Sequence, residues 1–201
     1  QVLIDGELFT EYVYRVINRP VLYPIIGPHG IGMTRNFPMK VGVAGEPQDH
    51  PHHTSLWYAH NPAGGVDCFS TLPGAGRIVH DQVLRTRGGT NRGMIETTSK
   101  WVAPDGKVIL TDTRVLTFHL IDGWRAIDWE IALQASHGEV TFGDSDHGGL
   151  AIRMNPSLQL VSRAGEGMAP ATGQAINSEG MRADASAGTG GGPVWGKRAR
   201  W

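Results

Sequence analysis

The sequence predicts an all-β protein, an antiparallel β-sandwich of two sheets. Glycine contributes 28 and proline 12 of the 201 residues, and both are scattered between short apolar runs. This distribution favours many short strands joined by turns over long helices. The stretches "VAPDGKVIL" and "HLIDGWRAI" each place an Asp-Gly pair between apolar runs. Such a pair is the strongest short-range signal for a β-hairpin.

A meander of three strands is predicted between residues 92 and 136. If Asp122 and Gly123 form a two-residue loop, Ile121 pairs with Trp124. The pairs that follow from this register are Leu120 with Arg125, Phe118 with Ile127, and Leu116 with Trp129. Residues directly opposite each other share a face of the sheet, so the register can be checked against polarity.

The predicted register separates apolar from polar side chains. One face collects Leu116, Phe118, Leu120, Ile127, Trp129 and Ile131, and the other collects Thr113, Thr117, His119, Asp128 and Glu130. One apolar and one polar face are typical of an antiparallel sheet in a sandwich. If the polar face is concave, Glu130 is a candidate general base or metal ligand. If it is convex, Glu130 is a solvated charge.

A single domain is expected over residues 1–201. Residues 164–193 are rich in glycine, alanine and serine and predict a long loop, in which a short helix near 174–183 is compatible with the sequence. The final stretch "GGPVWGKRARW" resembles a loop followed by the start of a strand, which predicts that the domain is truncated at its C-terminal end.

Composition argues against several classes of partner. The net charge is -1 and charged residues make up 18% of the chain, so neither nucleic acid nor an anionic membrane surface is expected as a partner. Apolar stretches such as "VLYPII" are far shorter than the roughly 20 residues of a spanning helix. Cys68 is the single cysteine and forms no internal disulfide. Compartment and oligomeric state do not follow from these features.

The stretch "DHPHHTSL" concentrates titratable side chains in one segment. Pro51 favours extended backbone at His50, and in an extended chain His50 and His52 share one face while His53 points to the other. Two imidazoles about 7 Å apart at the backbone could hold one metal ion or one polar ligand. A further metal ligand could come from Glu46, Asp49, Glu130 or His147. The alternative is a hydrogen-bonded loop without a ligand.

Three further residues are candidate ligand contacts. Arg35 follows a glycine-punctuated loop in "GIGMTRNFP", where a guanidinium could clamp a carboxylate or other ligand oxygens. His147 lies at the turn of "VTFGDSDHGGLAIRM", and a turn requires Asp and Gly but not His. Trp57 is either a stacking surface for a sugar or a core residue of a strand.

Motifs spread over nearly the whole chain resemble the PmoA-like family of bacterial proteins. They are "RPVLYPIIGPHGIGMTRNFPM", "DHPHHTSLWYAH", "GVDCFS", "GRIVH", "ASHGEVTFGDSDHGGLAIRM" and "GKRARW". The resemblance implies a β-sandwich of the galactose-mutarotase type that binds carbohydrate on a concave face. It also implies that His52 is a general acid and Glu130 a base, with Arg35, His53 and Trp57 as substrate contacts. At the positions of His147 and Cys68, family members often carry other residues.

Three hypotheses about function follow. The first is a carbohydrate-active epimerase, lyase or hydrolase that uses His52 and Glu130 on a saccharide and needs no cofactor. The second is a metal-dependent enzyme in which His50, His52 and a carboxylate hold a divalent ion, in keeping with the methane-oxygenase label of the family. The third is a non-catalytic carbohydrate-binding module.

Overall fold

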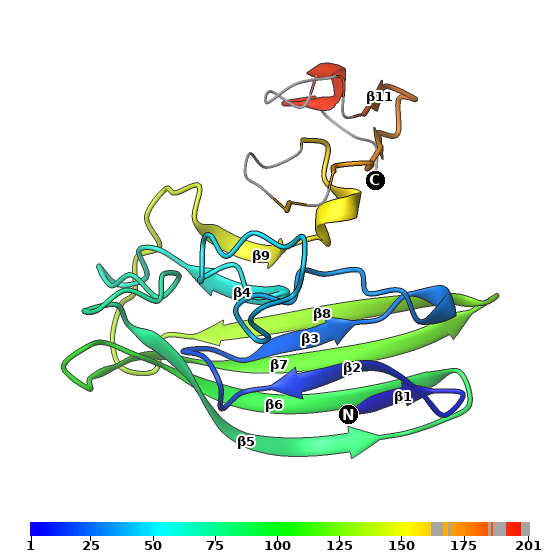
Figure 1. The fold of residues 1–201 in the computed structure, drawn as a ribbon. Coiled ribbons are helices and arrows are strands. Elements are labelled where there is room, and N and C mark those ends of the chain that lie inside the picture. The colour runs from blue at the N-terminus through cyan, green and yellow to red at the C-terminus, as the bar shows by residue number, and fades with distance from the viewer. Residues whose placement is uncertain (162–166, 169, 185, 187–191, 198–201) are drawn as a thin grey trace.

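The computed structural model describes residues 1–161, 167–168, 170–184, 186 and 192–197 (Figure 1). Its strands are β1 (Val2–Ile4), β2 (Glu7–Val13), β3 (Val21–Ile25), β4 (Leu56–His60), β5 (Arg77–Arg87), β6 (Arg92–Val102), β7 (Val108–Ile121), β8 (Trp124–Gln134), β9 (Gly148–Ile152), β10 (Ala175–Ile176) and β11 (Arg182–Ala183). Short 3-10 helices occupy Pro28–Gly30 (η1), Pro156–Leu158 (η2) and Gly192–Val194 (η4).

Two antiparallel sheets form the body of the protein. One has the strand order β1-β2-β3-β4-β9 and the other β5-β6-β7-β8, and they lie over one another as layers in Figure 1. The strands β10 and β11 form a separate two-stranded sheet. The predicted all-β antiparallel sandwich is therefore confirmed. No helix in the described part of the chain is long and apolar enough to cross a membrane.

The predicted meander is confirmed as β6, β7 and β8. Ile121 pairs with Trp124, and the register continues through Leu120–Arg125, Phe118–Ile127 and Leu116–Trp129. Asp122 and Gly123 have φ angles of 49° and 80°, as a type I′ hairpin turn requires. The Asp-Gly pair therefore sets the register locally.

The apolar face of this meander packs against the β1–β9 sheet. Leu116 and Phe118 lie in one buried cluster with Phe9, Leu22 and Ile25, and the rings of Phe9 and Phe118 meet edge-on at 6.2 Å. Ile127 and Trp129 flank the same cluster. The polar face, which carries Glu130, is therefore the outer face of the β5–β8 sheet.

The interior also holds a buried ion pair that the polarity pattern does not predict. Arg114 donates to both carboxylate oxygens of Asp112, at 3.0 and 2.7 Å, and Trp101 Nε1 donates to the same carboxylate at 2.8 Å. Both charged side chains are fully buried. Because neighbouring Thr97 and Ser99 are also buried, this end of the interior is polar.

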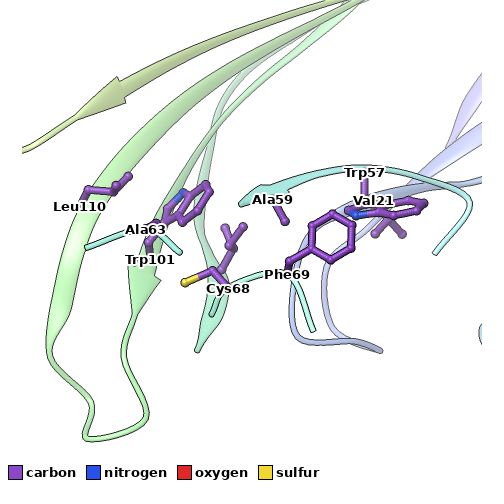
Figure 2. Close-up of a cluster of buried hydrophobic side chains, with 9 residues drawn as sticks. Val21, Trp57, Ala59, Ala63, Cys68, Phe69, Trp101 and Leu110 are labelled. Carbon is purple, nitrogen blue, oxygen red and sulfur yellow. The ribbon is translucent and has the colours of Figure 1, made fainter. Parts of the chain in front are cut away.

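A second apolar cluster supports the segment that carries the histidines. Tyr58 approaches Trp101 at 6.2 Å, and Leu56 packs on the core between the sheets. Trp57 and Ala59 alternate with these residues along β4 and belong to one buried cluster with Trp101 and Leu110 of the other sheet. There the loop after β4 packs Phe69 and Cys68 into the cluster of Trp57 and Val21 (Figure 2).

A hairpin replaces the short helix that the sequence allowed near residues 174–183. Asn177 Oδ1 accepts hydrogen bonds from the N–H groups of Glu179 and Met181, each at 3.0 Å, and Gly180 adopts a φ of 77°. This turn joins β10 to β11 because an asparagine side chain can replace backbone acceptors in a tight turn. Of the predicted long loop, residues 164–166, 169, 185 and 187–191 lie outside the described residues.

Candidate functional site

The histidine block forms a tight turn and not the extended segment that was expected. His53 N donates to His50 O at 2.9 Å, and His50 adopts a φ of 47°. The turn gathers all three rings, which an extended chain would separate. The ring centroids lie 5.6 Å apart for His50 and His52, 4.5 Å for His52 and His53, and 4.9 Å for His50 and His53.

Arg35 shapes this turn from within the protein. Its side chain is fully buried, and Nη2 donates to the carbonyl oxygens of His50 at 3.0 Å and His53 at 3.4 Å. Its other groups donate to Phe37 O, Pro47 O and the carboxylate of Asp49, the last at 2.6 Å. The guanidinium that was predicted to clamp a ligand therefore directs its donors at protein acceptors.

Buried Glu46 stabilises the start of the same loop. Its carboxylate accepts hydrogen bonds from the backbone N–H groups of Asn36 and Phe37 and from the Asn36 side chain. A buried carboxylate that accepts several N–H donors is satisfied without a metal ion. Glu46 therefore has a structural role in holding the loop before the histidines.

Two histidines at the surface are each oriented by an aspartate. His50 Nδ1 lies 3.0 Å from Asp49 Oδ2, and His147 Nδ1 lies 2.5 Å from Asp146 Oδ1. A carboxylate at Nδ1 favours the tautomer whose Nε2 is free to accept a proton or bind a ligand. Strand β9 pairs with β4, and this pairing brings His147 to the cluster, where its ring lies 6.3 Å from His52.

Phe69 connects the histidines to a buried arginine. Its ring is 5% exposed and lies 5.8 Å from His52, 5.3 Å from His147 and 5.8 Å from Trp57. The Arg19 guanidinium lies 5.6 Å from the same ring. Neither residue was predicted as a site residue, since a lone aromatic in "DCFS" and a lone arginine in "NRP" match no catalytic or ligand-binding pattern.

Arg19 is the least satisfied of these groups. Its side chain is fully buried, and its Nε donates to Asn18 Oδ1 at 3.0 Å, but neither Nη atom has a hydrogen-bond partner within the described part of the chain. Burial lowers the pKa of the Arg19 guanidinium to about 10. The group therefore remains charged at neutral pH and adds a fixed positive charge beneath Phe69.

Burial and positive neighbours keep the central histidines neutral. Burial lowers the pKa of His52, and His50 and Arg19 lower it further. Burial likewise lowers the pKa of His53 to about 3, with further contributions from His52 and Arg153. A neutral imidazole can accept a proton or ligate a metal, whereas an imidazolium can do neither.

The shifted pKa of His53 predicts a stability that falls on acidification. The unfolded imidazole takes up a proton as the pH falls through about 6.5, while the folded ring resists protonation down to about 3. The unfolded state therefore binds more protons in this window, and the free energy of unfolding falls as the pH falls. Urea unfolding at pH 7.5, 5.5 and 4.5 measures this decrease in the free energy of unfolding. In His53→Phe, which can still stack on Trp57, the fall should be smaller; an identical pH profile in both proteins would contradict the assignment.

The structure does not bring every candidate residue to the cluster. Glu130 is exposed on the outer face of the β5–β8 sheet and pairs with Val115. His53, in contrast, stacks on Trp57 of β4, which belongs to the other sheet. Glu130 thus does not share a site with His52. Trp57 joins the cluster but is 2% exposed beneath His53, so it supports the histidines from the core.

The geometry bears on the metal hypothesis as well. Within the residues that the structure describes, no group of three or more histidine, cysteine, aspartate and glutamate side chains has the arrangement of a metal site. His50 and His52 are close, but the nearest carboxylate, Asp49, is directed at His50 Nδ1 and at Arg35.

Fold and site together define an all-β sandwich protein with a histidine-rich site on the segments that precede β4 and β9. The chain belongs to DUF6807, a family of unknown function whose model matches residues 1–201. No curated protein and no solved structure matches the chain.

Proposed function

We propose that the histidine cluster is the acid–base site of a carbohydrate-active protein, in which His52 and His147 act on a bound saccharide. The observation that supports this most directly is a neutral imidazole, His52, next to an aspartate-oriented one, His147. The saccharide part of the proposal rests on the resemblance to the PmoA-like family and the mutarotase-type fold that it implies.

The spacing of the two rings suits proton transfer at two neighbouring oxygens of one sugar. Their centroids are 6.3 Å apart, and the rings can flank a sugar so that each nitrogen lies within about 2.6 to 3.2 Å of one of these oxygens. One imidazole can take a proton from a hydroxyl while the other, once protonated, returns one to the ring or leaving oxygen. This pair replaces His52 and Glu130, because His52 lies in the turn before β4 and Glu130 lies on the outer face of β8 in the other sheet.

The proposal predicts that His52→Ala lowers turnover by about 10²- to 10⁴-fold, because a positioned acid or base contributes that much. The measurement is exchange of anomers and product formation, followed by NMR, over neutral and uronic sugars. His137→Ala is the matched control, since His137 is exposed on the loop after β8, outside the cluster. Turnover that survives in His52→Ala would contradict the proposal, and so would a wild type that neither binds nor converts any of these sugars.

The same preparations distinguish two alternatives. A metal-dependent enzyme is favoured by the proximity of His50 and His52 and by the lowering of the His52 pKa through burial. It predicts near-stoichiometric metal that a His50→Ala, His52→Ala double variant loses. A non-catalytic carbohydrate-binding module predicts that His52→Ala weakens sugar binding while the wild type shows no turnover.

A further inference from the structure

A cavity of about 440 Å³ lies at the end of the sandwich where β5 turns into β6. Its walls come from β1, from the hairpin over residues 86–95 and from the end of β7, which lie close together in Figure 1. None of its lining residues belongs to the histidine site. The volume is in the range of sites for small ligands.

The cavity combines an apolar wall with a cationic rim. The apolar residues are Val2, Leu3, Ile4, Met94, Ile95, Phe118 and Leu120. The cationic residues are Arg87 and Arg92, and both also line an adjoining cavity of about 350 Å³ on the same hairpin. Apolar side chains suit the C–H face of a sugar ring, and guanidinium groups suit carboxylate or sulfate oxygens.

Arg87 and Arg92 have charges that the fold does not use. Neighbouring Arg85 pairs with Glu96 at 2.8 Å, whereas neither Arg87 nor Arg92 makes a side-chain hydrogen bond or ion pair within the described residues. Asp5 lines the same cavity from the β1–β2 turn and can accept hydrogen bonds from sugar hydroxyls. One cavity therefore offers guanidinium groups that can donate hydrogen bonds to an anion and a carboxylate that can accept them from sugar hydroxyls.

The two strands of the hairpin approach each other closely beside this cavity. A Cβ atom at Gly89 would lie 2.8 Å from Arg92 O, and one at Gly93 would lie 3.3 Å from Arg87 O. Glycine at these positions lets the two strands approach at the turn. The close approach fixes the backbone on either side of the two arginines.

We infer that this cavity is a second site that binds an anionic sugar residue, through a carboxylate as in a uronate or through a sulfate ester. The anion specificity depends only on Arg87 and Arg92, while the choice of a sugar rests on the proposed function. The two sites share no residue, so they can be tested independently.

The test is isothermal titration of the full chain with three probes: a galacturonic acid trimer, a sulfated galactose oligomer and neutral cellotriose. Binding of at least one anionic probe is expected, with at least a tenfold loss of affinity in the Arg87→Gln, Arg92→Gln double variant. Arg77→Gln is the matched control, because Arg77 is also an exposed arginine on β5 but lies outside the cavity. It should bind as the wild type does, and the two anionic probes show which anion is preferred.

Several outcomes would overturn the inference. They are no binding of either anionic probe, equal binding of cellotriose, and an equal loss in Arg77→Gln, which would indicate non-specific charge. A thermal melt checks that the double variant folds. It is expected to fold because both substituted residues are exposed. His52→Ala should retain binding of the anionic probe in this cavity. Failure of the histidine proposal can therefore be distinguished from failure of this inference.

Discussion

Replacing Arg35 with methionine is expected to lower the free energy of unfolding by about 3–5 kcal/mol, because it leaves several acceptors in the loop without their buried donor. The guanidinium is fully buried and binds the Asp49 carboxylate and four backbone carbonyl oxygens. Each acceptor left buried without a donor costs about 1–3 kcal/mol. Water that enters the loop relieves part of this cost.

The histidine turn should be lost along with the stability. Nη2 of Arg35 holds the carbonyl oxygens of His50 and His53, and without it the ring spacing of the cluster is no longer fixed. Urea unfolding measures the stability, and histidine NMR shifts report the turn. The unfolding free energy of Arg35→Lys should fall between those of the wild type and Arg35→Met, since an ammonium group cannot reach all five acceptors. Arg77→Met is the exposed control; a loss in Arg35→Met no larger than in that control would contradict the assignment.

The meander could be predicted from sequence because its determinants are local. The Asp122–Gly123 pair sets the turn, the turn sets the register, and the register sorts the side chains by face. Alternation then identified Leu116 and Phe118 as core. The curvature of the sheet does not follow from these determinants, and so the position of Glu130 on an outer face could not be derived.

The candidate site could be predicted only in part. The density of histidines in "DHPHH" indicated a site, and the structure does bring His50, His52, His53 and His147 together. The extended geometry was wrong because Arg35, 15 residues earlier than His50, draws the segment into a turn. Arg19 and Phe69 come from distant segments that meet only in the folded chain. Contacts between segments far apart in the sequence produce no local pattern from which they could be predicted.

The buried pair of Asp112 and Arg114 could not be predicted from sequence either, because the residues around it have the pattern of an ordinary strand. Asp112→Ala would leave the Arg114 guanidinium buried without its carboxylate and Trp101 Nε1 without an acceptor.

Asp112→Ala should therefore cost about 3–5 kcal/mol in unfolding free energy. Asp81→Ala is the matched control, since Asp81 pairs with Lys100 at 2.6 Å on an exposed face and should cost at most about 1 kcal/mol. Replacing both partners, as Asp112→Leu with Arg114→Met, should be less damaging than the single change, because no charge is then left buried alone. Urea unfolding of these variants measures the difference. If Asp112→Ala costs no more than Asp81→Ala, the pair is solvated in solution and the polar end of the sandwich interior is open to water.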